Sequence, residues 1–320
     1  MTPIARQLLA ALSGGVFALS LAGPALSQSA PDACKTVRFS DVGWTDITAT
    51  TALASVVLES LGYEPDVKVL SVPVTYASLK NKDIDVFLGN WMPTMEADIA
   101  PYREDGSVET LEPANLTGAK YTLAVPAYTY EKGLKSFDDI ARFKDELDGK
   151  IYGIEPGNDG NRLILGMIED DQFGLGDFEL VESSEQGMLA QVGRAVKRDE
   201  PIVFLGWEPH PMNANYEMKY LSGGDDVFGP DYGGATIYTN VREGYLDECP
   251  NVGQFLKNLK FTLPMENEIM GAILNDNKEG RTAAKEWLEA HPDTLDKWLE
   301  GVKTFSGKDG LPVVKESLGG

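Results

Sequence analysis

Apolar and polar residues alternate along the first part of the chain with two different periods. Short β-branched runs are typical of strands, and between them lies a segment whose apolar residues recur at helical spacing and which stops at Gly62. The pattern predicts strands at 37–42, 67–72 and 84–88 and helices at 48–61 and 76–80. Strands separated by helices predict a parallel sheet.

A second series of strands and helices begins near Tyr121. Strands are expected at 121–126, 151–154 and 201–205, and helices at 136–147, from the turn at 155–160 to about 168, and from Ser183 or Ser184 to 197. Ser136 and Asp139 form a capping box. Residues 233–241 look extended and lead the chain back, and helices are then expected at 252–259, 265–274, 283–290 and 295–302. This order predicts two similar α/β lobes between which the chain crosses, rather than two domains in series.

The N-terminus has the anatomy of a secretory signal peptide over residues 1–27. Arg6 precedes an apolar stretch at 8–21. Ala25 and Ser27 place small residues at the two positions that a signal peptidase recognises, which predicts cleavage after Ser27. The stretch is too short and too interrupted for a good membrane span. Since no cysteine follows the cleavage site to carry a lipid, we expect a soluble exported protein of a Gram-negative periplasm.

Charge and cysteine content narrow the class further. A formal net charge of −22 argues against nucleic-acid binding and is compatible both with a cationic ligand and with simple solubility. The only two cysteines are Cys34 and Cys249. In an oxidising compartment such a pair favours a disulfide, and two free buried thiols are the alternative.

The five tryptophans fall into two groups. Trp287 and Trp298 stand at helical core spacing, which indicates a structural role. Trp44, Trp91 and Trp207 instead each follow a glycine at the end of a predicted strand.

Two of these three positions repeat a short motif. Residues 86–93 read VFLGNWMP and residues 203–209 read VFLGWEP. Ligands of open α/β sheets bind beyond the carboxyl ends of strands, where all three rings are expected. One such tryptophan could simply cover the edge of a core, but three are harder to explain in that way. Converging rings suit a quaternary ammonium ion, whose diffuse charge matches the negative faces of aromatic rings.

Longer motifs resemble a known family. GWTD, VFLGNWMPTMEAD, KYTLAVP, IEPGNDGNR and FLGWEPHPMN are similar to those of periplasmic proteins that bind glycine betaine, proline betaine and choline for ABC transporters, and most of all to the choline-binding members. The resemblance extends over essentially the whole mature chain. It implies a type II periplasmic binding protein, which has two α/β lobes, a hinge crossed twice and a ligand in the cleft. It also implies a Cys34–Cys249 disulfide, no cofactor or metal, no catalytic activity, and delivery of choline to an inner-membrane permease by a monomer.

The resemblance assigns site residues by their place in these motifs. The aromatic box falls on Trp44, Trp91, Tyr121 and Trp207, and the contacts to the hydroxyl end of choline fall on Asp46 and Asn158. The expected first lobe comprises 28–119 and 231–320 and the second 120–230, with hinges near 117–123 and 224–236.

The residues themselves also favour choline over a betaine. An ionised Asp46 would repel a betaine carboxylate but can accept a hydrogen bond from a hydroxyl, and Asn158 can donate or accept. Structural alternatives remain, because Asp46 could be a helix N-cap and Asn158 a turn residue.

Other functions have weaker support. A binder of glycine betaine, carnitine or acetylcholine is the nearest alternative, and an enzyme acting on choline esters is the next. Glu208 and His210 suggest an acid–base pair for such an enzyme, but flanking prolines favour a rigid loop. Asp41 with Asp46, and Asp225 with Asp226, match no metal loop and are interpreted as solvated carboxylates.

Overall fold

The first lobe is built on a parallel sheet, as the pattern predicts. The computed structural model describes residues 29–319, so the predicted signal peptide lies outside the described residues. Strand β1 (Thr36–Asp41) pairs in parallel with β2 (Glu64–Val69) and with β3 (Val86–Met92). Helices α1 (Thr45–Ser60) and α2 (Val72–Lys80) connect these strands, and α3 (Glu96–Glu104) and β4 (Val108–Thr110) follow.

The second lobe repeats this plan around a mixed set of strands. Strand β6 (Lys150–Tyr152) pairs in parallel with β7 (Glu179–Val181) and with β8 (Phe204–Glu208). Strand β5 (Leu116–Pro126) runs antiparallel to β8 and to β9 (Met218–Tyr220). The helices of this lobe are α4 (Ala127–Glu131), α5 (Phe137–Ile140), α6 (Asp159–Glu169), α7 (Glu185–Val196), α8 (Met212–Asn215) and α9 (Asp225–Phe228), and α10 (Pro230–Gly233) leads the chain out of it.

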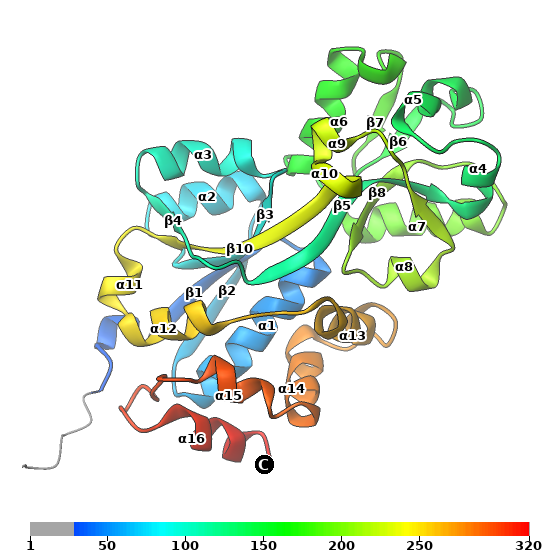
Figure 1. Ribbon diagram of the computed structural model, residues 1–320. Helices are drawn as coiled ribbons and strands as arrows, with labels where there is room; N and C mark the ends of the chain where they lie inside the picture. The colour runs from blue at the N-terminus through cyan, green and yellow to red at the C-terminus, as the bar shows by residue number, and fades with distance from the viewer. Residues whose placement is uncertain (1–28, 320) are drawn as a thin grey trace, which may run out of the picture.

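Two long strands join the lobes. Strand β10 (Gly234–Arg242) is antiparallel to β3, β4 and β5, which gives one curled sheet in the order β2-β1-β3-β10-β5-β8-β6-β7. Figure 1 shows β5 and β10 running together between the lobes. Because β5 pairs with β10 up to Lys120 and with β8 from Lys120 onward, we propose that the lobes divide there and again just before β10, at 119/120 and 230/231.

The chain ends in helices that pack on the first lobe. They are α11 (Tyr245–Glu248), α12 (Pro250–Asn258), α13 (Leu263–Leu274), α14 (Gly280–Ala290), α15 (Thr294–Trp298) and α16 (Gly310–Ser317). Helix α1 packs against α13 and α14 (Figure 1). Trp298 is fully buried, as predicted, whereas Trp287 is only half-buried and stacks on His291. Within residues 29–319, no helix has the length and apolarity needed to cross a membrane.

Some element boundaries differ from prediction for identifiable reasons. The strand expected at 67–72 begins at Glu64, because pairing with β1 fixes its register, and Val72 belongs to α2 instead. The helix expected at 136–147 has the predicted capping box but ends at Ile140 and continues as a short 3₁₀ turn. Few buried apolar residues hold that segment. The cap of α7 is Ser184, whose side chain accepts a hydrogen bond from the amide of Gly187.

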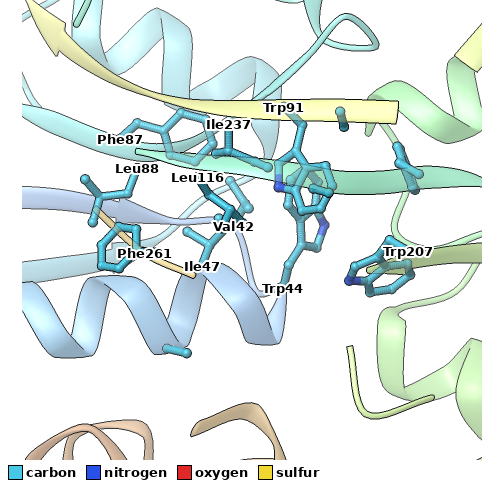
Figure 2. Close-up of a cluster of buried hydrophobic side chains, with 14 of the residues drawn as sticks. Val42, Trp44, Ile47, Phe87, Leu88, Trp91, Leu116, Trp207, Ile237 and Phe261 are labelled. Carbon is cyan, nitrogen blue, oxygen red and sulfur yellow. The ribbon is translucent and has the colours of Figure 1, made fainter. Parts of the chain in front are cut away.

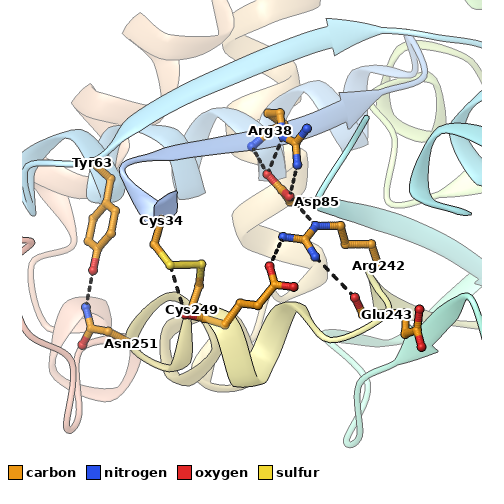
Figure 3. The surroundings of a disulfide bond; sticks show 9 residues. Cys34, Arg38, Tyr63, Asp85, Arg242, Glu243, Cys249 and Asn251 are labelled. Atoms are coloured by element: carbon orange, nitrogen blue, oxygen red, sulfur yellow. Dashed lines mark hydrogen bonds and ion pairs between the residues drawn. A yellow bond between two sulfur atoms is a disulfide. The ribbon is translucent and has the colours of Figure 1, made fainter. Parts of the chain in front are cut away.

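A disulfide and a charge network hold the outer end of the first lobe together (Figure 3). Cys34 and Cys249 are bonded, with Cα atoms 5.6 Å apart, which confirms the predicted pairing. Nearby, the buried carboxylate of Asp85 accepts hydrogen bonds from Arg38 Nη2 at 2.6 Å and from Arg242 Nε at 2.7 Å. These bonds join β1, β10 and the residue that precedes β3, and so they fix the strands whose opposite ends carry the site.

Candidate functional site

A small cavity lies between the two lobes and is lined by residues of both. Its walls are Trp44, Asp46, Trp91, Tyr121, Ile154, Asp159 and Trp207. The first three come from the start of α1 and the end of β3, and the others come from the second lobe. Figure 2 shows the three tryptophans at one end of the apolar core of the first lobe. The structure thus brings five of the six predicted residues to one cavity.

The strand ends present the rings slightly differently from the prediction. Strands β3 and β8 continue past their glycines, so that Trp91 and Trp207 are the penultimate residues of these strands. Gly89 is required for close packing, because a Cβ atom there would lie 2.6 Å from the Ile47 side chain. The glycine therefore lets α1 approach β3, and this approach places Trp44 beside Trp91.

The four aromatic side chains are buried, and those of Trp44 and Trp91 are held by hydrogen bonds at their edges. Their exposed fractions are 6% or less. The ring centroid of Tyr121 lies 6.0 Å from that of Trp91 and 6.2 Å from that of Trp207. Trp44 Nε1 donates to Glu155 at 2.7 Å, and Trp91 Nε1 donates to Asp46 at 3.1 Å. Because carboxylates satisfy both indole N–H groups, the rings are oriented and their faces stay available for a ligand.

Tyr121 is positioned by the first turn of α6. Its hydroxyl accepts a hydrogen bond from the amide of Gly160 and donates to Asn158 Oδ1 at 3.4 Å. Asn158 is the N-cap of α6, and its side chain accepts from the amide of Asn161 at 2.9 Å. Asn158 therefore lies behind the cavity wall, where it supports Tyr121, and its direct contact with a ligand stays a prediction.

Asp46 is a buried carboxyl group at the cavity. Trp44 occupies the N-cap position of α1, so the alternative that Asp46 caps this helix is wrong. One of its oxygens accepts from Trp91, and the other has no hydrogen-bond partner among residues 29–319. Burial, together with the negative charge of Glu185, raises the pKa of Asp46 to about 8. This oxygen is free to bond a polar group of a ligand.

The sequence interpretation missed two acidic residues of the second lobe. Asp159, the first residue of α6, lines the cavity and is fully buried, and burial raises its pKa to about 6. Glu155 holds Trp44, and burial raises its pKa to about 7. Both lie in the segment IEPGNDGNR, whose turn-forming composition masked them.

His210 does not pair with Glu208. Its Nε2 lies 3.1 Å from Glu185 Oε1, and its Nδ1 accepts from the amide of Met212 at 2.9 Å. Both ring nitrogens are therefore engaged, and they fix the imidazole as a structural group beside Trp207, with ring centroids 4.8 Å apart.

The interpretation of Asp41 and Asp46 as solvated carboxylates is wrong. Both are buried, and Asp41 accepts from the amide of Gly43 at 2.7 Å and from the hydroxyl of Thr48 at 2.8 Å. Asp225 and Asp226 are exposed, as predicted. In the part of the chain that the structure describes, no three acidic, histidine or cysteine side chains gather into a candidate metal site.

Comparisons with known proteins agree with this architecture. An ABC-transporter choline binding protein, solved in complex with choline, is 70% identical, and the match covers 90% of this chain and 100% of that one with a TM-score of 0.89. An unliganded, semi-closed structure with the same identity and coverage gives a TM-score of 0.83. The glycine betaine/carnitine transport binding protein GbuC of Listeria monocytogenes is 29% identical over 189 residues, 59% of this chain and 60% of that protein.

A family model covers most of the chain. It describes the substrate binding domain of ABC-type glycine betaine transport systems and matches residues 35–290. That range contains the whole of the second lobe, most of the first lobe and every residue of the cavity wall. The chain therefore belongs to the family of substrate-binding domains of ABC-type glycine betaine transport systems.

Proposed function

We propose that this protein captures choline and delivers it to a membrane permease. The observation that carries the proposal is the set of four aromatic rings around one cavity, with the indole N–H groups of Trp44 and Trp91 and the hydroxyl of Tyr121 already hydrogen-bonded. A trimethylammonium group donates no hydrogen bonds and is attracted to such faces by roughly 2 kcal/mol for each desolvated ring. Several rings, less the cost of immobilising the ligand, correspond to an affinity in the micromolar region.

The choice of choline among quaternary amines rests on the groups beside the rings. Choline ends in a hydroxyl group, which suits the unpartnered oxygen of Asp46. The choline complex of the 70% identical protein supports the same choice, since the match covers that whole chain.

Glycine betaine and carnitine are the second candidates. The family description and the Listeria relative both name glycine betaine, and the relative's name adds carnitine. Both ligands end in a carboxylate, which would enter a cavity whose wall already contains Asp46 and Asp159. Acetylcholine has no such carboxylate and is expected to compete better than the betaines, within the limits of the cavity volume.

The remaining parts of the proposal follow from the family. We expect a monomer in the periplasm of a Gram-negative cell, with an inner-membrane ABC permease as its partner and without enzymatic activity. Hydrolysis of choline esters would need a free base beside a nucleophile, and both nitrogens of His210 are already hydrogen-bonded. A turnover assay on acetylcholine tests this part, since measurable hydrolysis that is lost in His210→Ala would contradict it.

Intrinsic tryptophan fluorescence tests the ligand, because three tryptophans line the cavity. The purified protein is titrated with choline, acetylcholine, glycine betaine and carnitine. We expect saturable binding with choline tighter than either carboxylate ligand. Tighter binding of glycine betaine than of choline would overturn the choice of ligand and leave the transport role intact.

A further inference from the structure

Asp159 has an unusual environment for a buried carboxylate. It is fully buried at the start of α6 and lines the cavity, yet neither carboxylate oxygen has a hydrogen-bond partner within residues 29–319. Burying an ionisable group without a partner is costly, and the positive end of one helix offsets only part of that cost. The stability of the fold without ligand therefore does not explain why a carboxylate is buried at this position.

The surrounding residues do not explain it either. Asn158, not Asp159, caps α6. Arg162 is the nearest cation along the helix, and its charge favours the ionised form of Asp159, but its guanidinium donates across the cleft to Asp98 and to the carbonyl oxygen of Thr94 rather than to Asp159. The hydroxyl of Thr94 is close enough to favour the ionised form of Asp159, but it donates to the carbonyl oxygen of Trp91 at 3.3 Å. Local structure therefore leaves the charge of Asp159 directed at the cavity.

Aromatic rings alone do not distinguish choline from glycine betaine. Both ligands present the same trimethylammonium group to the rings, so discrimination depends on the charges around the rest of the ligand. Asp46 has a pKa of about 8 and is largely protonated in the empty cavity at neutral pH, where it could donate to a betaine carboxylate. Asp159, with a pKa of about 6, remains largely ionised.

We infer that Asp159 is a specificity-determining residue, whose buried, unpartnered carboxylate attracts ligands with a net positive charge and rejects zwitterions that end in a carboxylate. This inference rests on the proposed choline-binding function and refines it. Asp46 then mainly hydrogen-bonds the polar end of the ligand, and Asp159 contributes a negative charge from the second lobe. Removing this charge weakens choline binding and relieves the repulsion of glycine betaine.

Isothermal titration calorimetry on the full mature chain tests the inference with Asp159→Asn. The change removes the charge and preserves the shape of the side chain. We expect choline to bind roughly tenfold more weakly and glycine betaine equally well or more tightly, so that their affinity ratio falls by about tenfold or more. The matched control is Glu169→Gln, which removes one exposed charge from the same helix and is expected to leave the ratio unchanged.

An uncharged isostere of choline, 3,3-dimethylbutan-1-ol, separates charge from shape. The variant is expected to bind it as the wild type does, and Asp159→Ser serves as a second variant if the asparagine form does not fold. An equal loss for choline, glycine betaine and the isostere would overturn the inference, as would an unchanged ratio. Wild-type protein that binds no choline would instead refute the proposed function, so the two failures are distinguishable.

Discussion

Thr45 and Glu185 join the two lobes through two short hydrogen bonds. The amide of Thr45, at the start of α1, donates to Glu185 Oε2 at 2.8 Å, and its hydroxyl donates to Oε1 at 2.6 Å. Glu185 begins α7 in the second lobe, is 1% exposed and also accepts from His210. These hydrogen bonds can form only when the cleft between the two lobes is closed. They lie beside the cavity, because Trp44 precedes Thr45 directly.

Glu185→Gln is expected to weaken choline binding by opening the cleft. The amide would present an N–H₂ group to at least one of the donors from Thr45 and His210, so a charge-assisted bond worth about 1.5–3 kcal/mol is lost. This corresponds to roughly tenfold or more in affinity. Stopped-flow fluorescence should assign the loss mainly to faster dissociation, because only the closed state makes these bonds. Glu179→Gln, an exposed change in the same lobe, is the control, and equal effects of the two variants would contradict this role.

Trp207→Ala and Trp298→Ala should affect different properties. Trp207 lines the cavity, so its loss is expected to weaken choline binding at least about tenfold. Trp298 is 2% exposed on α15, and its removal is expected to lower the free energy of unfolding by about 3–5 kcal/mol with little effect on affinity. Calorimetric titration and urea denaturation measure the two effects. A similar loss of affinity in both variants would undo the division of the tryptophans.

Gly160→Ala is expected to disturb the aromatic box without touching the ligand. An added Cβ atom would overlap the hydroxyl of Tyr121, so this ring must move, and choline affinity should fall roughly tenfold. Gly166→Ala is a matched control on the same helix, since nothing lies within 4 Å of its added Cβ atom. This control should keep wild-type affinity and gain about 0.5–1 kcal/mol of stability. Wild-type affinity in both variants would argue against a fixed position for Tyr121.

Choline affinity is expected to rise between pH 5 and pH 8. A bound cation favours ionised carboxyl groups, so it lowers the pKa values of Asp159 and Asp46 from about 6 and 8 in the empty cavity. Binding below those values must release protons, and affinity falls by at most about tenfold per pH unit for each group. Glu155, with a pKa of about 7, adds to the same trend. The buried acids Glu185 and Glu266 also lie close enough to Asp46 to interact with its charge.

Calorimetry in buffers with different ionisation enthalpies measures the released protons. Glycine betaine provides the comparison, because its carboxylate disfavours further ionisation and its affinity should not rise with pH. A choline affinity that stays flat from pH 5 to pH 8, without proton release, would show that these carboxyl groups do not face the ligand.

Strand ends could be predicted from the sequence because each carries a strong local pattern. Trp44, Trp91 and Trp207 follow glycines at the ends of apolar runs, and the structure places all three at one cavity. Tyr121 has no local signal of this kind and was placed by the family resemblance alone. The start of β2 was misplaced because Val67 and Val69, which look like core residues, lie exposed on a strand whose register is set by β1.

Apart from Asp46, the acidic residues of the site could not be predicted, because their roles depend on contacts between distant segments. Glu185 reads as an ordinary first-turn acid of a helix, and only the folded chain brings it to Thr45, 140 residues away. Asp159 lies in a run of turn-forming residues, and Asn158 beside it proved to be the helix cap. The family resemblance assigned Asp46 to the site, whereas the high negative charge of the chain favoured solvated carboxylates for Asp41 and Asp46, which are in fact buried.

The most direct test of the account compares choline with its uncharged isostere on the wild-type protein. Both molecules have the same shape and the same hydroxyl group, and only choline has the positive charge that the rings and carboxyl groups are arranged to bind. Calorimetric titration at pH 7.5 is expected to show choline binding at least about a hundredfold more tightly than 3,3-dimethylbutan-1-ol. Equal affinities would contradict the account, because the cavity would then select shape and apolar surface rather than a quaternary ammonium ion.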